Sequence, residues 1–243
     1  MFSSLVIVIL IAAALAFATT KIPVAGNFFQ HYTTLIHEMG HASVAGFFGG
    51  RVKGIKLRLD TSGETASAWQ RGSTLSQIMS AISGYPAPVL FAALMVLPVI
   101  INEAHIAWWA MLVLSIFTIL LARSVFTLFS AVMFAVFPIL FLFLYPDAPA
   151  SLQTFVISFI AAIVLFNGVK DLGYMAKVAW VTKSDHTDAA ILSEFTIFGE
   201  RFWSTVIVLN TIIVSAVGVL SIVKHEDIAN FVQSVIDSIT QIF

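Results

Sequence analysis

The chain has 243 residues, of which 59% are hydrophobic and only 10% are charged. Because a soluble domain carries roughly 25% charged residues, this composition excludes an ordinary water-soluble fold and predicts a protein that crosses the membrane several times. The 12 Lys and Arg residues nearly balance the 13 Asp and Glu residues, so no nucleic-acid partner is expected, and with no cysteine any metal must be held by His and carboxylate.

Apolar runs long enough to cross a bilayer as helices recur along the whole chain. Six runs are clear, and a seventh, at 27–48, carries His31, His37, Glu38 and His41 among its apolar residues. Ionisable side chains within a membrane helix are costly and usually functional, so we expect this helix to lie inside the bundle; the alternative is an amphipathic helix on the membrane surface. The six clear runs are 4–20, 75–101, 105–122, 124–145, 150–167 and 202–223.

The positions of the basic residues predict an orientation. If seven helices alternate in direction, ten of the 12 Lys and Arg residues share one side, and only Lys21 and Lys224 lie on the other. Since Lys and Arg concentrate in cytoplasmic loops, this predicts a cytoplasmic N-terminus and an external C-terminus. A cleaved signal peptide is the alternative for 1–20, although its first five residues include no basic residue.

Two stretches outside the spans carry other patterns. After Gly49 and Gly50, apolar and basic residues alternate with a slip at Gly54, and a turn and a second short strand follow, which predicts a small membrane-associated β-hairpin at 51–69. Apolar residues recur at helical spacing in 224–243, which predicts an amphipathic tail at the membrane interface. With no repeat and no linker, we expect 1–243 to form a single all-α membrane domain apart from the hairpin, with 1–24 containing the first span.

His37, Glu38 and His41 form the pattern H-E-x-x-H within the predicted helix at 27–48. Four residues make about one helical turn, so both imidazoles project from one face and can bind one zinc ion, while Glu38 lies beside the open coordination position as a general base. Zinc lowers the pKa of a bound water and polarises a scissile carbonyl. The alternative is that both histidines are hydrogen-bonded bundle residues and that Glu38 pairs with a basic residue.

A hydrolytic zinc site needs a third protein ligand, and no third His follows at close spacing. Asp171 is the preferred candidate because it lies at the end of the span 150–167, where a carboxylate can reach into the bundle. The alternative for Asp171 is a solvated helix-end carboxylate near Lys170. His31, six positions before His37, is rotated off the ligand face, so we expect it to be an interfacial or structural residue. The remaining candidate ligands are Asp185, His186, Asp188 and Glu194.

The chain resembles the site-2 protease family of intramembrane zinc metallopeptidases, most closely its compact bacterial branch. The resemblance rests on H-E-x-x-H in a membrane helix, on Gly49, Gly50 and the hairpin that follows, and on the stretch from Ser184 to Trp203; it covers 25–215. It implies one zinc ion per chain, held by His37, His41 and a distant Asp, with Glu38 as the general base. It also implies a multi-pass protein of the bacterial inner membrane without a PDZ domain.

Together these observations predict a protease that hydrolyses a peptide bond in or near a transmembrane segment of a membrane-bound substrate, as in regulated intramembrane proteolysis. Such a substrate must unwind, because helical carbonyls are already hydrogen-bonded. The edge of the hairpin at 51–69 can receive the unwound segment as an added strand. The alternatives are a non-proteolytic membrane scaffold and a metal or proton transporter that uses the same His and Glu cluster.

Overall fold

The computed structural model describes residues 2–69, 73–182 and 187–223. The predicted amphipathic tail at 224–243 and the candidate ligands Asp185 and His186 lie outside these residues. The described chain is mostly helical with one antiparallel hairpin, which confirms the predicted fold class. The helices are α1 (Phe2–Thr19), α2 (Pro23–Phe47), α3 (Thr74–Ala81), α4 (Pro86–Ile100), α5 (Ala104–Leu121), α6 (Val125–Ile139), α7 (Ala150–Lys177), α8 (Asp188–Phe195) and α9 (Glu200–Val223), and the strands are β1 (Arg51–Leu57) and β2 (Gly63–Ala68).

The described residues contain fewer membrane spans than the seven predicted. Four helical segments are long and apolar enough to cross a bilayer, and two bent pairs, α1 with α2 and α3 with α4, raise the total to six if each pair is one span. The runs 4–20 and 27–48 thus form one pair, bent by 110°. The cause of this bend is local: the backbone of Ile22 is extended, and Pro23, which has no N–H, starts a new helix. The four segments are Ala104–Leu121, Val125–Leu144, Ala150–Thr182 and Glu200–Gly218.

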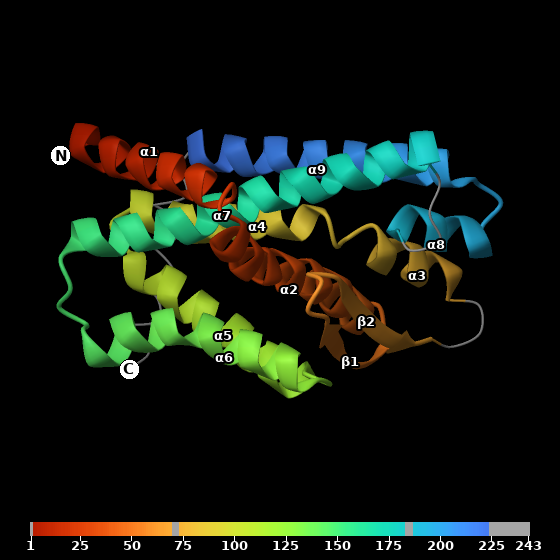
Figure 1. Cartoon of the computed structure of the whole chain (residues 1–243), viewed down its shortest axis with the longest axis horizontal. Coiled ribbons are helices and arrows are strands. Elements are labelled where there is room, and N and C mark those ends of the chain that lie inside the picture. The colour runs from red at the N-terminus through yellow and green to blue at the C-terminus, as the bar shows by residue number, and fades with distance from the viewer. Residues whose placement is uncertain (1, 70–72, 183–186, 224–243) are drawn as a thin grey trace, which may run out of the picture.

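The long helices run roughly along one axis, and their connections gather at two ends (Figure 1). The hairpin, α3 and α8 lie at one end, while the N-terminal end of α1 and the α4–α5 and α6–α7 connections lie at the other. α7 packs against α1 and α4, and α5 packs against α6. Trp108 on α5 is fully buried, stacks on Phe141 and donates a hydrogen bond to Gln153 on α7. The apolar core therefore joins the α5–α6 pair to the group formed by α1, α4 and α7.

The hairpin lies against α2 and the α5–α6 connection. β1 and β2 pair from Arg51↔Ala68 to Leu57↔Gly63, and the register shifts between Val52 and Gly54, which confirms the predicted slip. The outer edge of β1 is already bonded: the Arg123 N–H donates to the Ile55 carbonyl at 2.9 Å, and the Leu57 N–H donates to Thr127 Oγ1 at 2.8 Å. Among the described residues, the free edge of the hairpin is therefore β2.

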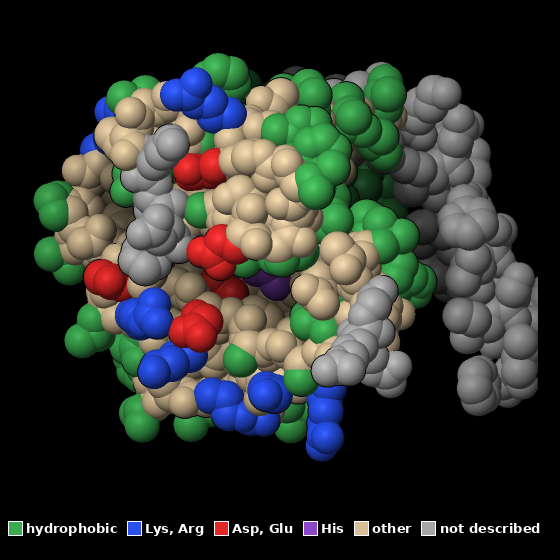
Figure 2. Space-filling model, turned by 90° about the vertical axis from the view of Figure 1, so that its right-hand side faces the viewer, with side chains coloured by type: hydrophobic (Ala, Val, Ile, Leu, Met, Phe, Trp, Pro, Cys, Tyr) green, Lys and Arg blue, Asp and Glu red, His purple; other side chains and the backbone are tan. Residues whose placement is uncertain are grey.

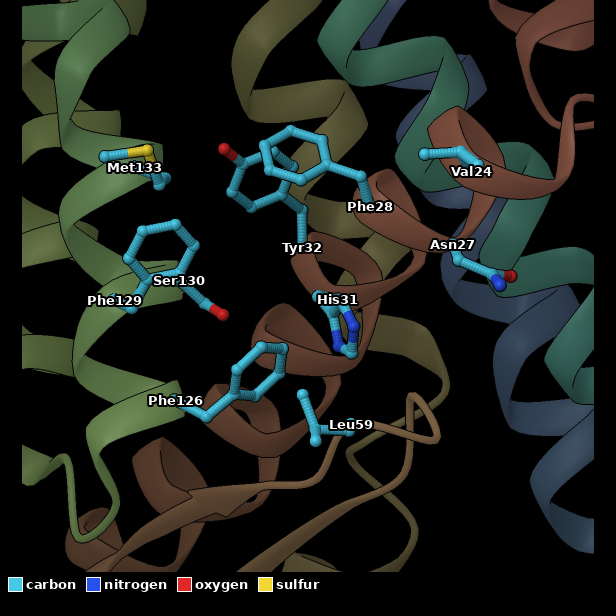
Figure 3. A pocket seen from close by; sticks show the side chains of 10 residues that line it. All are labelled: Val24, Asn27, Phe28, His31, Tyr32, Leu59, Phe126, Phe129, Ser130 and Met133. Atoms are coloured by element: carbon cyan, nitrogen blue, oxygen red, sulfur yellow. The ribbon is translucent and has the colours of Figure 1, made fainter.

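A small apolar pocket of about 210 Å³ opens between the first half of α2 and α6 (Figure 3). His31 lines this pocket with its ring against Phe126, the two centroids being 4.6 Å apart. His37 and His41 line a different cavity, on another face of α2. The structure therefore agrees with the sequence-based expectation that His31 is rotated off the ligand face.

The bent α1–α2 pair makes a topological prediction. If the pair crosses the bilayer once, the N-terminus faces the side opposite the hairpin, rather than the side predicted from seven crossings. Because the chain has no cysteine, single cysteines report sidedness directly. In sealed vesicles, a membrane-impermeant maleimide should label Ser3→Cys on the same side as Glu103→Cys and Asp147→Cys, and on the opposite side from Lys56→Cys. Labelling of Ser3→Cys and Lys56→Cys from one side would restore separate crossings by α1 and α2.

Candidate metal centre

Helix α2 brings His37 and His41 together as neighbours one turn apart. Their Nε2 atoms lie 3.0 Å apart. His41 Nδ1 lies 2.7 Å from the Ser80 carbonyl oxygen, which can only accept a hydrogen bond. That contact places the proton on Nδ1 and leaves the Nε2 lone pair of His41 facing His37, as a metal ligand requires.

Asp188, the first residue of α8, completes this group. Its Oδ2 lies 3.3 Å from His37 Nε2, and its Oδ1 lies 3.4 Å from His41 Nε2. Thr187 fixes the start of α8, because its side chain accepts a hydrogen bond from the Ala190 N–H as an N-cap. The Asp188 carboxylate therefore faces the Nε2 atoms of both histidines, where a third metal ligand would lie.

One ligand atom from each of His37, His41 and Asp188 lies within 4.8 Å of the others, so the three side chains can hold a metal ion. Two imidazoles and a carboxylate are a ligand set typical of zinc in hydrolases. Asp171, the preferred candidate from the sequence, is not part of this group; its Oδ2 accepts a hydrogen bond from Gln30 Nε2 at 2.6 Å. The geometry therefore replaces Asp171 with Asp188 as the candidate third ligand.

The reason for this replacement is the path of the chain after α7. Asp171 was preferred because it lies close in sequence to the end of a membrane span. The chain after α7, however, turns back so that α8 lies beside α3 and α9. Asp188, which lies beyond the end of the span in sequence, thereby reaches the histidines. The sequence signal that could have identified it is the likeness of the stretch from Ser184 to Trp203 to the carboxyl-terminal pattern of the family.

Glu38 lies next to the three candidate ligands and is fixed by the hairpin. Its side chain is 5% exposed, and Oε2 accepts a hydrogen bond from Thr65 Oγ1 at 2.6 Å. A Cβ at Gly63 would stand 2.6 Å from Glu38 Oε1, so β2 approaches the carboxylate too closely for a side chain at that position. The hairpin therefore holds the predicted general base beside the metal group, which consists of His37, His41 and Asp188.

The connection between α3 and α4 supports the histidines from the other side. A Cβ at Gly84 would stand 2.5 Å from His41 Nε2 and 2.6 Å from His37 Cε1. The Ser80 hydroxyl donates to the His41 carbonyl at 3.0 Å, and the Tyr85 ring packs edge-on against His37 with centroids 4.7 Å apart. This close backbone approach requires glycine at position 84.

The metal group lines a cavity of about 850 Å³ that also includes residues of the hairpin, α3, α7 and α8. The cavity opens at the hairpin end of the bundle, where Asp and Glu side chains surround a hollow with His at its base (Figure 2). Lys and Arg side chains lie further out on the same face. Among the described residues, the cavity therefore connects the metal group to this end of the bundle.

A membrane helix bundle whose His, His and Asp side chains converge beside a buried Glu has the ligands and the base of a metallopeptidase. The family comparison agrees: the model of the Peptidase M50B-like family matches residues 7–218, and the chain belongs to that family. Comparison with curated proteins and with solved structures finds no match.

The absence of a side chain at position 84 is testable. Gly84→Ala should lower metal affinity about 10- to 100-fold, because the added methyl group displaces the two imidazoles. The matched control is Gly173→Ala, where nothing lies within 4 Å of the added atom. Metal content after dialysis against graded chelator measures both variants, and equal affinity of Gly84→Ala and wild type would contradict the close approach.

Proposed function

We propose that the chain is an intramembrane zinc metalloprotease that hydrolyses a peptide bond in or near a transmembrane segment of a membrane-bound substrate. The observation that carries the proposal is the convergence of His37, His41 and Asp188 beside Glu38, in a cavity at one end of an apolar helix bundle. When bound by these three side chains, a zinc ion would lower the pKa of a water molecule and polarise the scissile carbonyl.

Glu38 is the proton carrier in this proposal. It takes the proton that the attacking water loses as the new C–O bond forms, and it delivers that proton to the nitrogen that leaves as the C–N bond breaks. The hydrogen bond from Thr65 Oγ1 holds one carboxylate oxygen, and Gly63 leaves space for the other. Glu38 is thus oriented before the substrate arrives, which is the arrangement that favours general base catalysis.

The substrate segment binds as a strand along β2. Ile55 and Leu57 direct backbone groups away from β2, towards Arg123 and Thr127. Because backbone groups alternate in an antiparallel pair, Gly63, Thr65 and Ser67 then direct theirs away from β1, towards the free edge. All three residues line the cavity that holds the metal group. An unwound segment paired with this edge has its carbonyls beside Glu38.

The orientation of the site follows from charge. The hairpin, which lies at one end of the bundle (Figure 1), carries several Lys and Arg residues; Arg123 lies in the α5–α6 connection and Arg201 in the first turn of α9. The tendency of such residues to remain in the cytoplasm supports a site near the cytoplasmic face. Cleavage there would release a cytoplasmic fragment of the substrate.

Metal content tests the ligand set. Purified wild type should hold one zinc ion per chain, and both His37→Ala and Asp188→Asn should lose it, because each removes a ligand. Asp171→Asn should retain zinc. The opposite result, loss in Asp171→Asn with retention in Asp188→Asn, would return the third ligand to Asp171.

Glu38→Gln tests the chemistry separately. The variant should keep its zinc and lose about 100- to 10,000-fold in cleavage rate, because the amide cannot accept the proton from water. The measurement is cleavage of single-span membrane substrates in liposomes, with zinc content measured on the same preparation. Zinc bound without any dependence of cleavage or phenotype on Glu38 would favour a metal-binding scaffold or a transporter.

Strand addition to β2 predicts a position-specific effect of proline. Ser67→Pro removes an outward N–H and should lower cleavage at least about fivefold, at unchanged zinc content, because one hydrogen bond to the substrate contributes about 1 kcal/mol. The matched control is Leu57→Pro, which removes the bond to Thr127 and should instead lower the thermal stability of the protein. Unchanged cleavage by a stable Ser67→Pro variant would reject strand addition.

A further inference from the structure

The cavity around the metal group is acidic. Five of its lining residues are Asp or Glu, and none of the described residues that line it is Lys or Arg. Glu38 and Asp188 belong to the metal centre. Asp60 accepts hydrogen bonds from the N–H and hydroxyl of Ser62, and Glu64 pairs with Arg58 at 2.9 Å. The fifth acid is Asp171, and within the described residues no Lys or Arg nitrogen lies within 4 Å of its carboxylate.

Gln30 adds an unpaired acceptor beside Asp171. Its Nε2 donates to Asp171 Oδ2 at 2.6 Å, and because a carboxylate can only accept, this contact fixes which end of the amide is which. The other end, Oε1, is buried and has no partner among the described residues, and the whole side chain is only 7% exposed. Gln30 and Asp171 both line the cavity. A buried acceptor without a donor is unfavourable, so this pair is suited to a ligand that brings hydrogen-bond donors.

We propose that Gln30 and Asp171 form a subsite for a cationic side chain, Lys or Arg, of the substrate segment held in the cavity. A lysine ammonium has three donors and no acceptor, so it can bond to the Asp171 carboxylate and, once the Gln30 amide turns towards the cavity, to the Gln30 oxygen as well. Tyr174, one turn beyond Asp171 on α7, also lines the cavity and offers an aromatic surface to the aliphatic stem.

This inference rests on the proposed function and narrows its substrate class. Single membrane spans carry Lys and Arg at their cytoplasmic ends. A cytoplasmic-facing site that binds one such residue selects segments at the boundary between span and cytoplasmic flank. An acidic residue at the same position is repelled by Asp171. The subsite therefore both favours segments with Lys or Arg at this position and disfavours segments with Asp or Glu there.

The test uses peptide hydroxamates, because the chelating group binds zinc whatever the side chains are. At each of the three residues nearest the hydroxamate in turn, one peptide carries Lys, one norleucine and one Glu, and the three are otherwise identical. On zinc-loaded wild type, Lys should bind at least about tenfold tighter than norleucine at one of these positions, and Glu should bind more weakly than norleucine. In Asp171→Asn and in Gln30→Leu, at wild-type zinc content, the Lys preference should fall to about twofold or less.

The matched control is Glu64→Gln, which removes another acid of the cavity and should keep the Lys preference. An equal loss in Glu64→Gln and Asp171→Asn would show a diffuse acidic field and overturn the subsite, as would equal binding of the three peptides to zinc-loaded wild type. Loss of zinc from Asp171→Asn would also overturn the subsite and make that residue a ligand. If wild type holds no zinc and binds no hydroxamate, the proposed function fails, and the subsite fails with it.

Discussion

A polar group buried in an apolar helix bundle is more favourable when it has a partner within the protein, and such partners position the side chains of the metal group. His41 Nδ1 donates a hydrogen bond to the Ser80 carbonyl, and this bond fixes the orientation of the imidazole. Glu38 is held in the same way by Thr65. Thr65 of the hairpin and Ser80 at the end of α3 thus supply hydrogen bonds to one helix turn of α2.

The same constraint explains why two glycines approach the group. A side chain at position 84 would push the supporting segment away from His41, and one at position 63 would push it away from Glu38. The hydrogen bonds would then be too long. Gly84 and Gly63 remove that obstacle, one on each side. The metal group is thus enclosed by backbone, which is more rigid than side chains would be. Rigid support of this kind keeps catalytic groups near their productive geometry.

The sequence predicted the features that are local along the chain. Helical spacing within His37, Glu38 and His41 gave the ligand face, alternation gave the hairpin, and the slip at Gly54 gave the register shift. Features that depend on long-range packing were not predictable in the same way. Apolar composition alone does not distinguish two spans from one pair bent at Pro23. Asp171 was preferred over Asp188 because it lies closer in sequence to the end of a membrane span. That criterion contains no information on the turn that brings α8 back to the histidines. Likewise, only the contacts of Ile55 and Leu57 identify β2 as the free edge.

The opening of the cavity at the end of the bundle also changes the energetics of a helical substrate. Unwinding one turn in lipid would expose about four N–H and four C=O groups at several kcal/mol each, which is prohibitive. In a cavity of about 850 Å³ that opens to the aqueous side, water can hydrate those groups, and the edge of β2 can bond to some of them. Under the proposed function, the protein therefore need not force the helix apart, because water in the cavity and the edge of β2 would replace the hydrogen bonds that unwinding breaks.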